Sequence, residues 1–170
     1  MKYSKSIPLI VCFTLFIVLG SHNREAKSKK LAKAFLQQFV IPGADLVKLN
    51  NGLRPALKDY KKYFTADVFM KAKNAYEKVW KPGMTVVKPK SGQTQILIWK
   101  ATTKELKTRK GNANFFPGGY KKASRYLRPG HTVYRFKFVK KGEKYGMAYD
   151  GLVFIDGRWV IFPKPWKFVR

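Results

Sequence analysis

The stretch that decides the fold is HTVYRFKFVKKGEKYGMAYDGLVFIDGRWVIF, residues 131–162. In residues 131–139 aromatic side chains alternate with mostly basic ones, which predicts a half-buried antiparallel strand. Residues 145–155 predict the next strand, and the dipeptide Asp156-Gly157 is a strong hairpin signal. Residues 158–162 then return along that strand, so the end of the chain predicts an antiparallel meander.

Helical periodicity dominates the region before the first predicted strand. Apolar residues recur at helical spacing between about 25 and 40 and predict an amphipathic helix. A second stripe predicts another helix with Pro55 in its first turn, where proline is tolerated; its members are Leu53, Leu57, Tyr60 and Phe64. Thr65 is the expected N-cap of a third helix, which Pro82-Gly83 ends.

The middle of the chain changes character. Residues 85–88 and 94–103 are rich in β-formers. Residues 108–130 lack a clear period, which indicates a long loop containing a short helix at 120–127. Helices followed by an antiparallel meander predict an α+β fold, with the N-terminal helices packed on a curved antiparallel sheet.

This layout resembles the nuclear transport factor two-like superfamily, which also contains ketosteroid isomerase. The similarity covers residues 31–162 in layout and is carried by the final hairpin, GLVFIDGRWVI at 151–161. Three predicted helices precede any strand, whereas many members insert a helix after the first hairpin; the loop at 115–120 stands in that place. The resemblance implies a cone-like sheet with a cavity, and a fold that hosts enzymes and binding proteins alike.

The first residues have the features of a targeting segment. Lys2 and Lys5 precede the uncharged run Ile7–Gly20, which is short for a membrane crossing and typical of a signal peptide. We therefore expect a signal peptide at 1–21, a basic polar linker at 22–30 and one domain at 31–170. Export to the periplasm or the exterior follows, with an uncleaved N-terminal anchor, or a lipid on Cys12, as the alternatives.

The charge balance is the strongest compositional signal. The 170 residues contain 36 Lys and Arg against 9 Asp and Glu, a formal net charge of +27. Such an excess favours a negatively charged partner, namely an anionic polymer or an anionic membrane surface. Specific reading of nucleic acid is not favoured, because no zinc finger, basic zipper or recognition helix is visible. The predicted basic patch comprises Lys121, Lys122, Arg125, Arg128, Arg135, Lys137, Lys140 and Lys141.

Catalytic motifs are few, so the sequence favours a non-catalytic function over an enzymatic one. It lacks the HExxH, Walker A, GxSxG and GxGxxG patterns. One Cys and two His leave little for a metal site, and we expect neither metal nor cofactor. The weak catalytic candidates are Asp150, His131 and Tyr134. Asp150 has the strand parity of Ala148, Leu152 and Phe154, which would bury its carboxyl group in the cone.

Aromatic residues in the predicted sheet are either core or the lining of a ligand pocket. The pocket candidates are Trp99, Tyr134, Phe136, Tyr149 and Trp159. The sequence thus predicts a secreted, non-catalytic domain that binds an anionic envelope component or a small apolar ligand in its cone. The alternative is a small isomerase-like or hydrolase-like enzyme that uses Asp150 as acid or base. The oligomeric state stays open.

Overall fold

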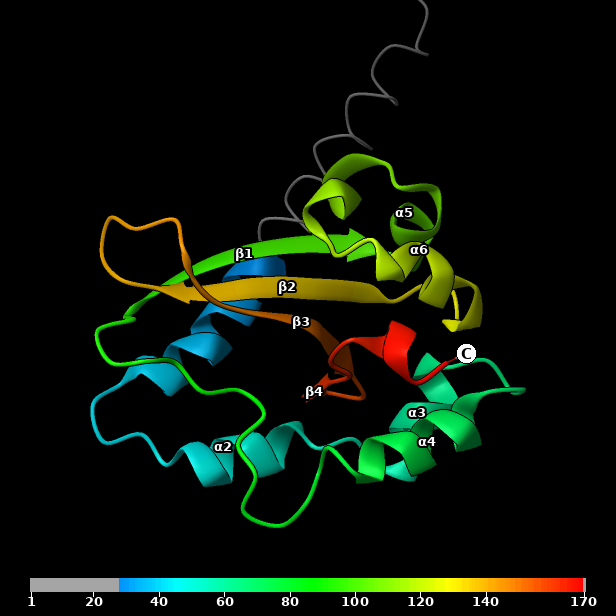
Figure 1. The fold of residues 1–170 in the computed structure, drawn as a ribbon, viewed down its shortest axis with the longest axis horizontal. Helices are drawn as coiled ribbons and strands as arrows, with labels where there is room; N and C mark the ends of the chain where they lie inside the picture. The colour runs from blue at the N-terminus through cyan, green and yellow to red at the C-terminus, as the bar shows by residue number, and fades with distance from the viewer. Residues whose placement is uncertain (1–27, 170) are drawn as a thin grey trace, which may run out of the picture.

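The sheet is a simple meander. A computed structural model describes residues 28–169, in which the four strands pair antiparallel in chain order. They are β1 (Gln95–Thr102), β2 (Thr132–Val139), β3 (Gly146–Ile155) and β4 (Arg158–Ile161). The sheet is curved and does not close on itself (Figure 1). The predicted α+β class is confirmed, whereas the signal peptide at 1–21, Cys12 and most of the linker lie outside the described residues.

The last hairpin forms where the sequence predicts it. Asp156 and Gly157 both have positive φ angles, 49° and 79°, as a two-residue type I′ turn requires. Beyond this turn Arg158 donates to the buried carboxylate of Asp59 at 2.5 Å and to the carbonyl oxygens of Gly52 and Arg54 at 3.0 Å. The hairpin is therefore joined to the helical region far upstream in the chain.

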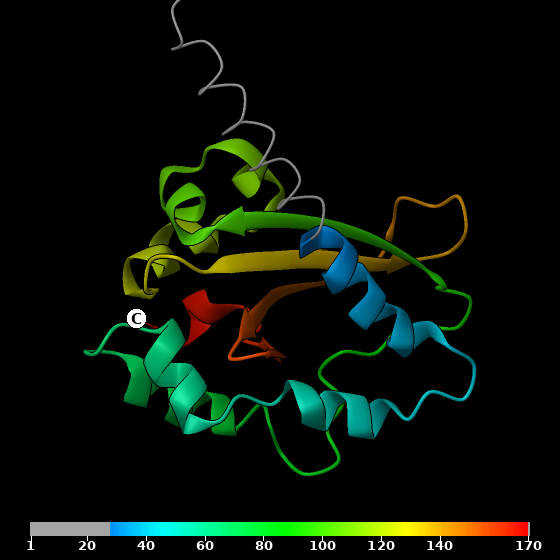
Figure 2. The same ribbon diagram turned by 180° about the vertical axis from the view of Figure 1, so that it is seen from behind.

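The first helix crosses one face of the sheet. Residues 28–37 are α-helical and continue into η1 (Gln38–Val40). Phe39 packs on Phe138 of β2, and Phe35 stacks on Trp159 of β4. Figure 2 shows this helix lying across β1 and β2. The aromatic parity of β2 thus faces the helix, and the basic parity faces the other side.

The predicted second helix is wrong in its boundaries. The stripe from Leu53 to Phe64 is not one helix, because Leu53 is the last residue of α2 (Leu46–Leu53) and Leu57 is the first residue of α3 (Leu57–Tyr63). Pro55 lies in the break between them. Because the residue before a proline is driven out of the helical region, α2 ends before it.

The predicted N-cap of the third helix is also wrong. The helix α4 (Phe69–Glu77) begins four residues beyond Thr65, after a turn in which the Thr65 carbonyl accepts from Val68 and Phe69. The Thr65 hydroxyl has no hydrogen-bond partner among the described residues. Thr65 therefore starts a turn and does not cap the helix.

Residues 85–88 form no strand in the described chain, although they are rich in β-formers. The side chain of Asn50 takes the place of a neighbouring strand. Its amide donates to the Val87 carbonyl at 2.8 Å and its oxygen accepts from the Val87 N–H at 2.7 Å. Both backbone groups of Val87 are thereby satisfied without a sheet.

The short helix expected at 120–127 is confirmed, and further short helices lie on either side of the start of the segment that was expected to be a loop. The helix α5 (Thr103–Thr108) precedes residues 108–130, and η2 (Gly111–Phe115), α6 (Gly119–Ala123) and η3 (Ser124–Tyr126) lie within them. In Figure 1, α5 and α6 lie together beside the end of β1. Thr102 and Glu105 form a capping box that starts α5. Short elements of this kind lack the long apolar period that the sequence reading relied on.

A β-bulge at Asp150 and Gly151 changes the faces of β3. Gly151 has φ +84°, and the register with β2 shifts between Tyr134 and Arg135. The extra residue reverses the parity beyond it, so Asp150 shares its face with Ala148 and not with Leu152. The predicted parity of Asp150 with Leu152 and Phe154 is wrong for this reason.

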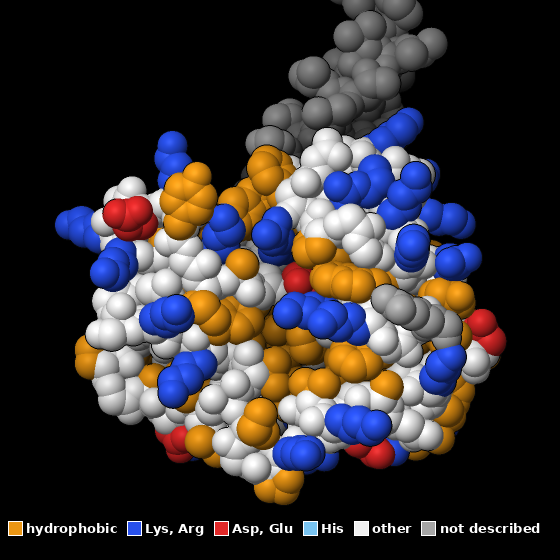
Figure 3. Space-filling model, viewed as in Figure 1, with side chains coloured by type: hydrophobic (Ala, Val, Ile, Leu, Met, Phe, Trp, Pro, Cys, Tyr) orange, Lys and Arg blue, Asp and Glu red, His pale blue; other side chains and the backbone are white. Residues whose placement is uncertain are grey.

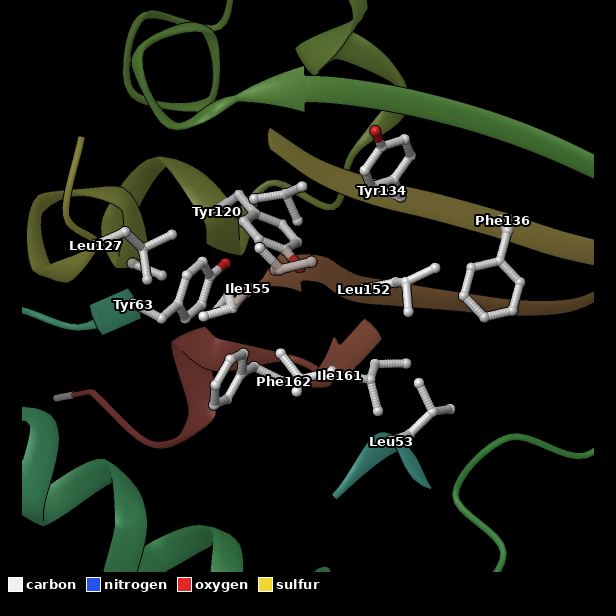
Figure 4. Close-up of a cluster of buried hydrophobic side chains, with 14 of the residues drawn as sticks. Leu53, Tyr63, Tyr120, Leu127, Tyr134, Phe136, Leu152, Ile155, Ile161 and Phe162 are labelled. Carbon is white, nitrogen blue, oxygen red and sulfur yellow. The ribbon is translucent and has the colours of Figure 1, made fainter. Parts of the chain in front are cut away.

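The helical layer closes over the end of the sheet. Phe64 and Leu127 form a β-bridge, Thr65 N–H donates to the Tyr126 carbonyl, and Arg128 N–H donates to that of Tyr63. Behind this closure lies an aromatic core in which Tyr63 stacks on Phe162 at 4.6 Å between ring centroids. Figure 4 shows the rings of Tyr63 and Tyr120 reaching this core from α3 and α6.

Candidate functional site

A large hollow lies between α6 with η3 and the C-terminal helix η4 (Pro165–Lys167). We call it the α6–η4 pocket; its volume is about 730 Å³. Its walls combine basic, aromatic and small residues: Gly118, Gly119, Lys122, Ala123, Arg125, Tyr126, Trp166 and Val169. None of these described lining residues is acidic. Figure 3, drawn from the same side as Figure 1, shows Lys and Arg around hydrophobic side chains on this face.

A glycine allows the two walls to approach each other. A Cβ atom on Gly119 would lie 2.3 Å from Cγ of Trp166, far inside contact distance. Next to it, the Tyr120 ring packs edge-on against the Trp166 indole at 5.1 Å between centroids. At Gly118 a Cβ atom would meet nothing within 4 Å. Gly119 therefore sets the spacing of the pocket, whereas Gly118 does not.

Asp150 joins both walls through one oxygen atom. Its Oδ1 accepts from the Tyr120 hydroxyl at 2.9 Å and from the Lys164 backbone N–H at 3.0 Å. Tyr120 belongs to α6, and Lys164 is the N-cap of η4. Asp150 is only 8% exposed and is not among the lining residues. Asp150 therefore links the two walls, since a group from each wall donates a hydrogen bond to the same carboxylate.

Burial favours the protonated form of the Asp150 carboxyl group. Desolvation raises the pKa of Asp150 above its ordinary value, while the donated hydrogen bonds from Lys164 and Tyr120 and the charge of Arg135 act against that rise. Burial also raises the pKa of Tyr120 well above its usual range. Tyr120 therefore remains a hydrogen-bond donor throughout the physiological range.

Two further buried tyrosines lie near the Asp150 carboxylate without forming a hydrogen bond to it. The Tyr76 hydroxyl donates to the Pro163 carbonyl at 2.9 Å, which anchors the approach to η4. The Tyr63 hydroxyl has no hydrogen-bond partner among the described residues. Burial raises the pKa of both, and the negative charge of Asp150 adds to the rise.

The residues of the predicted basic patch lie in several separate places. Lys122 and Arg125 line the α6–η4 pocket, and Arg125 lies over the Tyr126 ring at 5.1 Å from its centroid. Arg128 instead donates to the carbonyl oxygen of Phe64 at 3.0 Å. Lys121 is exposed on α6 but is not a lining residue. These four residues do not share one helical side, because α6 and η3 are short and the chain is extended from Leu127.

The remaining patch residues belong to the sheet. Arg135 and Lys137 share a face of β2, and Lys137 lies over the rings of Trp99 and Tyr145. Lys140 and Lys141 are exposed in the turn after β2, outside the lining of the α6–η4 pocket. The eight cations thus do not form one site.

The predicted aromatic pocket is brought together only in part. Tyr134 and Trp159 line a small hollow under the first helix. Phe136 and Tyr149 lie on the same face of the sheet as Tyr134, and their rings stack with 5.3 Å between centroids. Phe136 is fully buried there. Trp99 stacks on Phe115 on the opposite face. Because Trp99 points away from the other four, it does not share a pocket with them.

The three catalytic candidates do not meet. Asp150 contacts Tyr120 and the Lys164 backbone, and Tyr134 lies on the other face of the sheet. A ring nitrogen of His131 lies 2.8 Å from the Lys62 carbonyl oxygen. Within residues 28–169 no group of three or more His, Cys, Asp or Glu side chains could hold a metal ion.

The sequence reading missed Trp166 and Gly119 as parts of a site. No local period marks residues 163–169, because η4 is one turn held by contacts with α6 and with Asp150. The pair Gly118-Gly119 was the available signal, since adjacent glycines often mark a close approach of another segment.

Comparisons with known proteins give no relative. Neither the family models, the curated proteins nor the solved structures contain a match to this chain. Membership of the nuclear transport factor two-like superfamily accordingly stays a prediction. In the described part of the chain, no helix is both long and apolar enough to cross a membrane.

Proposed function

We propose that this protein is a non-catalytic binding domain that holds an anionic polymer in the α6–η4 pocket. The observation that carries the proposal is the composition of that pocket: Lys122 and Arg125 lie beside Trp166 and Tyr126 in a hollow of about 730 Å³. Cationic side chains neutralise the charges of a polymer, and aromatic rings stack on its flat groups.

The charges of the pocket are available to a ligand. Ion pairs among the described residues join Lys62 to Asp156, Lys73 to Glu77 and Arg158 to Asp59. Neither Lys122 nor Arg125 takes part in one of these pairs, and both side chains are exposed. Binding of an anion there would not have to break an existing ion pair.

The proposed setting is outside the cytoplasm, with an anionic component of the cell envelope as the ligand. The predicted signal peptide supports this setting, and an uncleaved segment would tether the same domain to a membrane. A catalytic role for Asp150 is not proposed, because both of its hydrogen bonds serve to hold the walls together.

The test compares two double variants with the same loss of charge. Lys122→Gln with Arg125→Gln removes the cations of the pocket; Lys141→Gln with Lys144→Gln removes two exposed cations elsewhere. Retention of each protein on a sulfated polysaccharide, on single-stranded DNA and on anionic vesicles is measured over a salt series. The slope of log affinity against log salt should fall by about 1.4–1.8 for the pocket variant, at about 0.7–0.9 per engaged charge.

Matching slopes for the two double variants would contradict the proposal, because the whole surface would then attract the polymer. A second variant separates the pocket from its charge. Gly119→Ala places a Cβ atom against Trp166 and should weaken binding without changing net charge. Gly118→Ala is the matched control and should bind as the unmodified protein does.

A further inference from the structure

A second hollow lies under the first helix, on the face of the sheet opposite Asp150. Its volume is about 180 Å³, and its lining is Ser28, Leu31, Tyr134, Phe154 and Trp159. We call it the helix-1 pocket. Leu31 and Phe154 are 57% and 52% exposed, although both are large apolar side chains. Two exposed apolar side chains at the mouth of an apolar hollow indicate a site at which an apolar group of a ligand would bind and cover them.

The walls of this pocket are held in fixed positions. The Trp159 ring contacts the rings of Phe154, Tyr134 and Phe35, with centroid distances of 5.0, 5.4 and 5.7 Å. Tyr134, a residue of β2, is only 3% exposed. The hollow is therefore formed before any ligand arrives, which reduces the entropic cost of binding.

One end of the pocket is polar and positively charged. Lys100 of β1 donates to the Ser28 hydroxyl at 3.0 Å. Lys100 is half-buried and takes part in none of the ion pairs found among the described residues. A half-buried ammonium group beside an apolar hollow favours a ligand that brings a negative charge to that end.

We propose that the helix-1 pocket binds a single-chain carboxylate, with its hydrocarbon tail between Leu31, Phe154 and Trp159 and its carboxylate at the Lys100 ammonium group. An apolar cavity of about 150 Å³ accepts benzene, so this pocket has room for about six methylene groups. This site is independent of the anionic polymer proposed for the α6–η4 pocket.

Chain length provides the first test. Sodium butyrate, hexanoate, octanoate and decanoate are titrated into the full-length protein, with binding followed by tryptophan fluorescence and by calorimetry. The affinity should rise about fourfold for each added methylene group and then level off near octanoate, once the pocket is filled. A flat series, or a rise that continues unchanged through decanoate, would overturn the proposal.

Two variants locate the ligand. Lys100→Gln should weaken octanoate binding at least tenfold and leave binding of octanol unchanged, because octanol carries no charge. Lys144→Gln, an equal change of charge at an exposed position, should leave both unchanged. Phe154→Ser should weaken both octanoate and octanol, and its 52% exposure makes it compatible with folding. Octanoate binding that is insensitive to Lys100→Gln and to Phe154→Ser would place the ligand elsewhere and refute the site.

Discussion

The hydrogen bond between Tyr120 and Asp150 is the most direct way to measure how the two walls of the α6–η4 pocket are held. Tyr120→Phe deletes one hydroxyl group and leaves the ring that packs on Trp166. A hydrogen bond to a charged acceptor contributes about 1.5–3 kcal/mol to the free energy of unfolding. We expect a loss of that size at neutral pH.

Tyr63→Phe is the matched control for this change. Tyr63 is equally buried and belongs to the same aromatic cluster, but its hydroxyl has no partner among the described residues. Removing an unsatisfied buried hydroxyl is neutral or stabilising by about 1 kcal/mol. The two substitutions delete the same atom, so the difference between them reports the Asp150 contact.

The pH dependence gives the experiment a second readout. Because burial raises the pKa of Asp150, the folded protein keeps this proton to a higher pH than the unfolded chain does. The contribution of Asp150 to stability is therefore fully present below the ordinary aspartate pKa and is lost as pH rises through the raised value. Loss of the Tyr120 donor should raise that pKa further, so the destabilisation by Tyr120→Phe should grow as pH rises.

Urea unfolding between pH 4 and pH 8, followed by circular dichroism, measures all three proteins. The Asp156 carboxyl, whose pKa is lowered mainly by its hydrogen bond from Lys62, changes stability in the opposite direction: its contribution is lost as pH falls. That contribution is common to the three proteins and cancels in their differences. The reasoning fails if Tyr120→Phe behaves like Tyr63→Phe at pH 7, or if their difference does not widen with pH.

Two further substitutions test contacts of the last hairpin. Arg158→Ala leaves the fully buried Asp59 carboxylate without its cation and should lower the free energy of unfolding by about 3–5 kcal/mol, measured by urea denaturation; a loss below about 1 kcal/mol would show that the pair is not needed. Gly151→Ala places a Cβ atom 2.0 Å from the Phe162 carbonyl oxygen and should lower the melting temperature far more than Gly157→Ala, where only the positive φ angle opposes the change. Similar melting temperatures for these two glycine variants would argue against the close approach at Gly151.

The sequence predicts the regular parts of the sheet well, because the alternation of apolar and polar residues along a strand shows which of its faces is buried. Along β2 the aromatic parity packs under the first helix and the basic parity is turned away from it. The same logic fails at Asp150, since one inserted residue at Gly151 reverses the parity beyond it. A bulge depends on pairing with the neighbouring strand, and a single segment does not reveal that pairing.

The candidate site is less predictable than the fold for a related reason. Lys122 and Arg125 could be found as a local cluster of charge, but their aromatic neighbour Trp166 is more than forty residues away in the chain. Arg128 belongs to the same local cluster, yet its guanidinium group bonds to the Phe64 carbonyl instead. Spacing assigns residues to a cluster, whereas the tertiary path of the chain decides which of them share a pocket.

The meander and its helical cover also have different consequences for the order of folding. Each strand pairs with the next in the chain, so most of the sheet needs only short loops to close. The bridge between Phe64 and Leu127 instead encloses the whole of α4, β1, α5 and α6, and the entropy cost of closing this loop is larger. We therefore expect β2 and β3 to form before α3 docks on the chain after η3. Pulse-labelled hydrogen exchange should show amides of β2 and β3 protected earlier than the Thr65 and Arg128 amides, and the reverse order would exclude this route.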